Sequence, residues 1–172
     1  FNTSELSHDV AMGHEGMRAP LPSREEIADS IELTSLAYQF DGLVLIASCD
    51  KIVPGMLMGA FRVNIPTIMV TGGPMLPGEL NGERMDYSTV LEALARYKEK
   101  KIDENELHAI QCNACPGAGS CAGMFTANTM ACVTEALGMS LKGCATAHAV
   151  SGNKLRIAQK TGEKIVELAE KE

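Results

Sequence analysis

Three consecutive side chains, Cys49, Asp50 and Lys51, combine a thiol, a carboxylate and an amine one residue beyond the apolar run 42–47. A helix expected to begin near Pro54 points its positive dipole end at them, which lowers the pKa of a thiol and favours a bound anion or metal cluster. An ordinary strand-to-helix turn with its charged pair facing water fits the same residues. Composition alone leaves both interpretations open.

A second segment is a glycine-rich turn that contains Cys112, Cys115 and Cys121. Glycines in such a turn let backbone N–H groups point toward the sulfur atoms of an iron–sulfur cluster. A small zinc site is the weaker alternative, because no fourth ligand follows at finger-like spacing. A purely structural turn would not need three thiols.

The chain has 172 residues, 45% of them hydrophobic and 22% charged, which fits one globular domain with a substantial core. The net charge of −7 and the lack of a Lys/Arg cluster argue against nucleic-acid binding. No apolar run approaches the ~20 residues that cross a bilayer, so no membrane partner is expected.

Without a secretory signal pattern, the six cysteines favour metal ligation over disulfides, and the expected compartment is the cytoplasm, or an organelle matrix in a eukaryote. Cys132 and Cys144 lie among small apolar residues, which predicts buried, inert thiols.

The elements that position these loops are predicted to alternate between helix and strand. Apolar periodicity predicts helices over 23–39, 54–63, a stretch after 84, 103–111, 122–137 and 151–171. Short apolar runs over 42–47 and 67–70 predict strands that are buried on both faces. Ser23 and Glu26 have the spacing of a capping box. This order predicts an α/β fold, with three α/β/α layers and a largely parallel sheet, in which ligands gather beyond the carboxyl ends of the strands.

Longer motifs surround both loops. Residues 49–56 read Cys-Asp-Lys-Ile-Val-Pro-Gly-Met, and residues 115–130 read Cys-Pro-Gly-Ala-Gly-Ser-Cys-Ala-Gly-Met-Phe-Thr-Ala-Asn-Thr-Met. With further matches at 11–17, 21–24, 27–30, 64–66 and 72–75, they resemble the signatures of the dihydroxy-acid and phosphogluconate dehydratase family. The resemblance runs from residue 1 to about 167, and motifs of this length are very specific.

The resemblance implies roles for four residues. Cys49 and Cys121 align with two cysteine ligands of the family's iron–sulfur cluster, expected to be of the 2Fe–2S rather than the 4Fe–4S type. Asp50 aligns with a magnesium ligand, and Lys51 with a lysine that is carbamylated and then also binds the magnesium. Carbamylation turns a cation into an anionic oxygen ligand, which a hard divalent ion needs.

The implied reaction is dehydration of a small 2,3-dihydroxy carboxylic acid to a 2-keto acid, a step in valine and isoleucine biosynthesis. In the family, magnesium holds the substrate, a serine base removes the C2 proton and the open cluster iron acts on the 3-hydroxyl. The serine, a third cluster cysteine and a further magnesium ligand are expected outside this chain. Residues 1–172 are therefore expected to be part of the N-terminal cluster- and magnesium-binding domain of a longer, homodimeric enzyme with a β-rich C-terminal domain. Alone, they are expected to be inactive.

One segment departs from the family pattern. Where the family reads Ser-Asp-Gly-Ile, this chain has Ser7-His8-Asp9-Val10, and the family aspartate is normally a magnesium ligand. Strict register puts His8 at that position, and imidazole is a poor ligand for magnesium. Either the loop shifts so that Asp9 reaches the metal, or the site is weakened and His8 points at it. Loss of the glycine favours the second hypothesis, because glycine gives a tight loop its freedom.

Two alternatives to the branched-chain enzyme remain. One is a sugar-acid dehydratase of the same family, of the phosphogluconate type. The other is a non-catalytic iron–sulfur or zinc module built on Cys112, Cys115 and Cys121, which would ignore Cys49. His14 is expected only to shape its loop.

Overall fold

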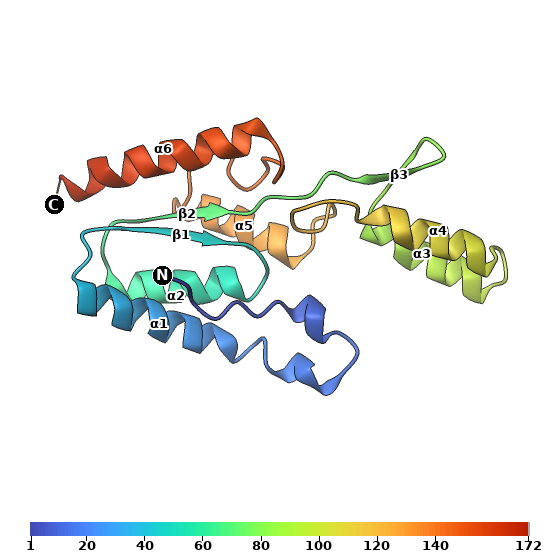
Figure 1. The fold of residues 1–172 in the computed structure, drawn as a ribbon, viewed down its shortest axis with the longest axis horizontal. Coiled ribbons are helices and arrows are strands. Elements are labelled where there is room, and N and C mark those ends of the chain that lie inside the picture. Colours follow the sequence, from blue (N-terminus) through green and yellow to red (C-terminus); the bar gives the residue numbers. More distant parts are fainter. Residues whose placement is uncertain (172) are drawn as a thin grey trace.

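A parallel pair of strands lies at the centre of residues 1–171, the part of the chain that this computed structural model describes (Figure 1). Strand β1 (Leu43–Ala47) pairs with β2 (Thr67–Thr71) in the register that sets Leu43 opposite Thr67. Parallel neighbours need a crossover connection, and helix α2 (Ile52–Val63) supplies it. The loops that follow both strands therefore meet at one end of the sheet.

The remaining elements surround this β–α–β unit. They are the short 3-10 helices η1 (His8–Ala11) and η2 (Glu15–Arg18), helix α1 (Ser23–Tyr38), the antiparallel hairpin β3 (Gly78–Leu80) and β4 (Glu83–Met85), and helices α3 (Tyr87–Lys98), α4 (Glu104–Ala114), α5 (Thr126–Ala136) and α6 (Gly152–Ala169). Helices α3 and α4 stand beside the rest of the molecule, next to the hairpin (Figure 1). Within residues 1–171, none of the helices combines the length and the apolar character needed to cross a bilayer.

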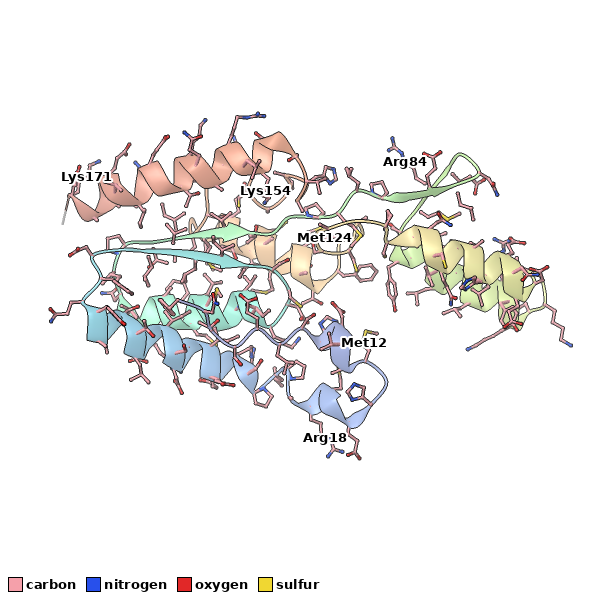
Figure 2. All side chains as sticks on the ribbon, viewed as in Figure 1. Met12, Arg18, Arg84, Met124, Lys154 and Lys171 are labelled. Carbon is pink, nitrogen blue, oxygen red and sulfur yellow. The ribbon has the colours of Figure 1, made fainter. Side chains whose placement is uncertain are left out.

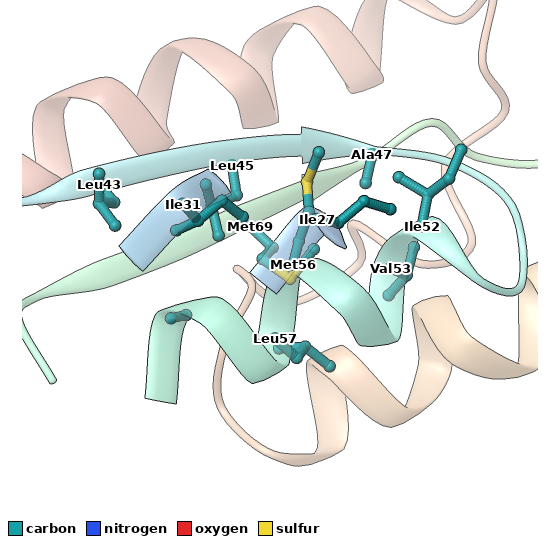
Figure 3. Close-up of a cluster of buried hydrophobic side chains, with 11 residues drawn as sticks. Ile27, Ile31, Leu43, Leu45, Ala47, Ile52, Val53, Met56, Leu57 and Met69 are labelled. Carbon is teal, nitrogen blue, oxygen red and sulfur yellow. The ribbon is translucent and has the colours of Figure 1, made fainter. Parts of the chain in front are cut away.

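The main core lies between β1, α1 and α2 (Figure 3). Ile27 and Ile31, one turn apart on α1, are fully buried against Val53 and Met56 of α2. The two helices approach closely because Gly59 faces α1, where an added Cβ would lie 2.8 Å from the Cβ of Ile31. This packing fixes α2, and with it the loop that joins β1 to α2.

The structure confirms the α/β class, whereas the sheet has only two strands within residues 1–171, so the three-layer arrangement stays an expectation. The prediction that β1 is buried on both faces is wrong. Val44 and Ile46 are 40% and 67% exposed, because α6 packs on that side through Val70 of β2 and leaves them uncovered.

Several predicted helix boundaries are also wrong. Ser23 opens α1 but forms no cap, because its hydroxyl donates to the Pro20 carbonyl oxygen at 2.7 Å. A capping box is formed instead at the start of α3, by Asp86 and Thr89. Helix α2 begins two residues before the predicted Pro54, at Ile52. Helix α4 runs on to Ala114 and so contains Cys112, and α5 begins only at Thr126. The β3–β4 hairpin lies in a segment for which the apolar runs predict no strand.

Candidate metal and cluster site

A cavity of about 550 Å³ opens where three distant segments meet. They are the N-terminal loop at 7–12, the end of β1 at 48–49, and the loop and first turn of α5 at 119–128, with Met75 and Tyr87 completing the wall. Cys49 and Cys121 both line this cavity. The fold thus brings together the two thiols that the sequence motifs single out.

Cys49 turns the chain from β1 into α2. Its φ of +86° is in the left-handed region that a side chain other than glycine rarely adopts, and such strained positions gather at functional sites. Its Sγ lies 3.1 Å from Ser7 Oγ and 3.4 Å from Asp50 Oδ1. The strained turn therefore aims the thiol at the N-terminal loop.

The loop that carries Cys121 is fastened to the chain beyond β2. The Ser120 N–H donates to the Gly73 carbonyl oxygen at 3.0 Å, and the Met75 N–H donates back to the Ser120 carbonyl oxygen at 2.8 Å. Gly119 makes this close approach possible, since its φ is +127° and an added Cβ would lie 2.5 Å from the Met75 nitrogen.

Asn128, on α5, orients the same loop through its side-chain amide. Its buried side-chain amide donates to the carbonyl oxygens of Cys121 and Gly123, at 2.8 Å each, and its Oδ1 accepts from Ser120 Oγ at 2.6 Å. Asn128 belongs to the motif quoted above, but its role could not be predicted from the motif, because the hydrogen bonds depend on how the loop folds back over the helix. The Asn128 amide therefore helps the backbone contacts with Gly73 and Met75 to hold Cys121 in place.

Burial raises the pKa of the Cys121 thiol, and the neighbouring Cys115 and Asp9 raise it further. An uncharged thiol is a poor metal ligand, so binding of a metal or cluster must release this proton. The Cys121 thiol therefore stays protonated until a metal ion or cluster binds.

Asp50 is the buried anion of the site, with a side chain only 5% exposed. Its Oδ2 accepts from Lys51 Nζ at 2.5 Å and its Oδ1 from His8 Nδ1 at 2.8 Å. Burial alone would raise the pKa of Asp50, but hydrogen bonds from Lys51, Cys49 and His8 outweigh it and hold the pKa below its usual value. Asp50 is therefore ionised and ready to face a cation.

His8, and not Asp9, occupies the position beside Asp50, as the strict register predicted. The other ring nitrogen of His8, Nε2, lies 3.0 Å from Asp9 Oδ1, and Asp9 itself is 65% exposed. His8 Nδ1 also lies 3.9 Å from Cys49 Sγ. The imidazole thus stands between two carboxylates and next to a thiol.

The other cysteines do not line the cavity, although Cys115 is near enough to Cys121 to raise the pKa of its thiol. Cys112 is exposed on α4, where its Sγ lies 3.5 Å from His108 Nε2, and neither Cys112 nor Cys115 lines the cavity. The position of Cys112 on α4, beside His108, counts against a single three-cysteine module. Cys144 is fully buried as predicted, whereas Cys132, on α5, is only partly buried.

His14 shapes its loop, as expected. Its Nδ1 accepts from the Gly16 N–H at 3.1 Å at the start of η2, and its Nε2 lies 3.2 Å from the Val10 carbonyl oxygen. Both nitrogens are therefore used within the loop.

Comparison with known proteins places these loops in a family. The pattern described as "Dihydroxy-acid/6-phosphogluconate dehydratase N-terminal" matches residues 1–172. Proteins named dihydroxy-acid dehydratase from Methanococcus maripaludis (strain C5) and Methanosarcina barkeri are 59% identical, over 100% and 98% of this chain, and one from Methanosphaera stadtmanae is 54% identical over 99%. The chain spans 31%, 30% and 31% of these relatives' lengths. The residues around Cys49 and Cys121 thus belong to a chain that is a member of the dihydroxy-acid/6-phosphogluconate dehydratase family, corresponding to its N-terminal region.

Proposed function

We propose that this chain is part of a hydro-lyase that removes water from small 2,3-dihydroxy carboxylic acids to give 2-keto acids. The names of its relatives support this activity, which is a property of the longer protein because the chain spans about a third of their length. The observation that carries the proposal is that Cys49 and Cys121, from loops far apart in the sequence, line one cavity.

An iron–sulfur cluster fits this pair of thiols. Cys49 and Cys121 would hold it, with the third cysteine in another part of the longer protein, and a 2Fe–2S cluster with three protein thiolates would supply a Lewis-acidic iron. Ser7 lies within hydrogen-bond distance of the Cys49 sulfur, a contact of the kind that tunes such centres. Asn128 keeps the Cys121 backbone in position for the same purpose.

The lining of the cavity favours an aliphatic substrate over a sugar phosphate. Met12, Met75, Tyr87 and Phe125 form apolar wall, and the Tyr87 and Phe125 rings meet edge to face with centroids 5.6 Å apart. Within residues 1–171, no Lys or Arg lines the cavity to bind a phosphate group. A short branched carbon chain packs on this apolar part of the wall, where a hydroxyl would find no partner. These features favour the step in valine and isoleucine biosynthesis over the phosphogluconate-type reaction.

Magnesium fits the neighbouring residues only in part. The Asp50 oxygens suit a hard divalent ion, and a carbamylated Lys51 would add another oxygen. His8, however, presents an imidazole nitrogen where an oxygen ligand is needed. We therefore keep a divalent ion beside Asp50 in the proposal but assign no step of the reaction to it. A homodimer in the cytoplasm or an organelle matrix remains part of the same proposal.

The test uses the full-length protein with its cluster assembled anaerobically. We expect it to convert 2,3-dihydroxyisovalerate to the keto acid and to leave 6-phosphogluconate unchanged. Cys49→Ser and Cys121→Ser should each abolish the visible absorbance of the cluster, whereas Cys132→Ser, outside the cavity, should keep it. Turnover of 6-phosphogluconate alone would reverse the choice of substrate, and equal loss of absorbance in all three variants would show that these thiols support folding rather than the cluster.

A further inference from the structure

The position beside Asp50 carries donors of mixed type. His8, Asp9 and Cys49 offer a nitrogen, an oxygen and a sulfur that lie within 4.8 Å of one another, and Asp50 Oδ1 lies 2.8 Å from His8 Nδ1. Imidazole and thiolate select zinc and the later first-row ions, whereas magnesium prefers an octahedron of oxygens. We propose that His8 and Asp50, joined by Cys49 when the cluster does not engage it, bind a first-row transition ion of the Zn²⁺ or Fe²⁺ class in preference to Mg²⁺. The inference rests on the proposed function only for the presence of a divalent ion beside Asp50.

The spacing of the three proposed ligand atoms, His8 Nδ1, Asp50 Oδ1 and Cys49 Sγ, is close to what such an ion needs. Ligand atoms around a tetrahedral zinc-type ion lie roughly 3.3–3.7 Å apart, given bond lengths of about 2.0–2.3 Å. In this structure Cys49 Sγ lies 3.4 Å from Asp50 Oδ1 and 3.9 Å from His8 Nδ1. The 2.8 Å separation of His8 Nδ1 and Asp50 Oδ1 must widen, as happens when a metal ion replaces the shared proton, and the 3.9 Å separation of Cys49 Sγ and His8 Nδ1 must shorten slightly.

Asp9 has the role of a positioning residue. It faces Nε2 of His8, on the opposite side of the ring from Asp50, so it does not reach an ion bound at Nδ1. Metal-bound histidines commonly donate their second N–H to a carboxylate, which fixes the tautomer and orients the ring. Ser7 Oγ donates to Asp9 Oδ2 at 3.0 Å and holds that carboxylate in turn. Asp9, one residue after the position of the family aspartate, thus orients His8, which occupies that position.

Solvent access is graded across the site. The side chains of Asp50 and His8 are 5% and 26% exposed. An ion can therefore reach Nδ1 of His8 from solvent, while the Asp50 carboxylate is shielded from water. Cys49 and Asp50 precede α2, whose N-terminus is capped by no side chain. The ion would bind Oδ1 of the buried Asp50 carboxylate, whose Oδ2 keeps its contact with Lys51 Nζ.

The experiment is a competition for Mn²⁺ in the full-length protein, with its cluster intact and other divalent ions removed. The probe is Mn²⁺, whose bound fraction is measured by electron paramagnetic resonance while Mg²⁺ or Co²⁺ is added. A Cys112→Ser background removes the exposed His108–Cys112 pair, which is a second place for Co²⁺ to bind. We expect Co²⁺ to displace Mn²⁺ at concentrations at least roughly tenfold lower than Mg²⁺ does, and spin-echo modulation from a directly bound ¹⁴N.

Two variants and a matched control decide the outcome. His8→Asp should abolish the ¹⁴N modulation and make Mg²⁺ at least roughly tenfold more effective, and Asp9→Asn should weaken Mn²⁺ binding by roughly 10–100-fold. His14→Asp makes the same charge change in the neighbouring loop and should leave the Co²⁺/Mg²⁺ ratio unchanged.

Equal displacement by Mg²⁺ in the parent and in His8→Asp, with no ¹⁴N modulation in either, would overturn the inference. Cluster absorbance and turnover are recorded separately, so failure of the dehydratase proposal leaves this ion preference standing, and the reverse is also true.

Discussion

The side-chain ammonium of Lys154 donates a hydrogen bond to the carbonyl oxygen of Thr71, 2.7 Å away, at the point where β2 ends. It also donates to the Cys144 carbonyl oxygen at 2.5 Å, and burial lowers the pKa of this lysine. Figure 2 shows Lys154 on the side of α6 that faces the strands. Since β2 leads directly to Gly73, which binds the loop of Cys121 through Ser120, the lysine anchors the strand end on which that loop rests.

Replacing Lys154 by methionine should therefore destabilise the protein. The substitution keeps the apolar stem but leaves two buried carbonyl oxygens without their donor, which costs about 2–4 kcal/mol. Chemical denaturation measures the loss, and Lys160→Met, an exposed position on the same helix, is the matched control. Unchanged or increased stability in Lys154→Met would mean that the cost of burying the ammonium exceeds the value of its two hydrogen bonds.

Glu135 should make stability depend on pH in the acid range. Its carboxylate accepts hydrogen bonds from the Gly143 and Ala145 N–H groups, at 2.8 and 3.0 Å, and these lower its pKa from the usual 4.5. Because the folded pKa is the lower one, the contribution is fully present above pH 4.5 and is lost as the pH falls through the folded pKa. Glu135→Gln should be less stable than the parent at pH 7, and the difference should shrink on acidification. A difference that stays constant with pH would show that ionisation of Glu135 is irrelevant.

Gly119 should tolerate no side chain, whereas Gly117, two residues earlier, should accept one. An alanine Cβ at 119 meets the Met75 nitrogen at 2.5 Å in a left-handed conformation, while nothing lies within 4 Å of a Cβ at 117. Gly119→Ala should cost about 1–3 kcal/mol from backbone strain, with a further loss as the loop separates from residue 75. Thermal unfolding and the cluster content of the full-length protein report both effects. Similar behaviour of the two alanine variants would disprove the tight approach.

Much of this site could be predicted from the sequence because its chemistry is local. The motifs at 49–56 and 115–130 located both loops, and the apolar runs located β1 and β2 to within a residue or two. The alternation of helix and strand then predicted that loops after neighbouring strands meet. Cys49 and Cys121 accordingly line the same cavity.

What failed depends on contacts between distant segments. Alternate residues of β1 are exposed because one face of this strand is left uncovered. The apolar run 42–47 does not show which faces other elements will cover, so the exposure of Ile46 could not be predicted from it. Ser23 had the spacing of a helix cap, but the turn that precedes it offers the Pro20 carbonyl as a closer partner. The bridge that His8 makes between Asp9 and Asp50 exists only because the fold brings the N-terminal loop to the end of β1.

Lys51 provides the last prediction. Its Nζ lies 2.5 Å from Asp50 Oδ2 and its side chain is 24% exposed, so carbon dioxide can reach the nitrogen. The ammonium must first release a proton, and the amine releases a second proton to solvent as the carbamate forms. A carbamate on Lys51 would place a second anion beside the buried Asp50, and this repulsion is relieved only by a cation between them. Carbamylation and binding of the divalent ion should therefore be coupled.

The full-length protein equilibrated with ¹³C-bicarbonate should show a carbamate signal by ¹³C nuclear magnetic resonance when the divalent ion is present, and lose it when the ion is removed. Lys51→Arg should show no signal and no activity even though it keeps the positive charge, because a guanidinium is neither deprotonated nor carbamylated. Lys142→Arg, on the loop that follows α5, is the control and should keep the signal. A carbamate signal that survives removal of the ion would break the proposed coupling, and an active Lys51→Arg enzyme would show that only the positive charge of Lys51 matters.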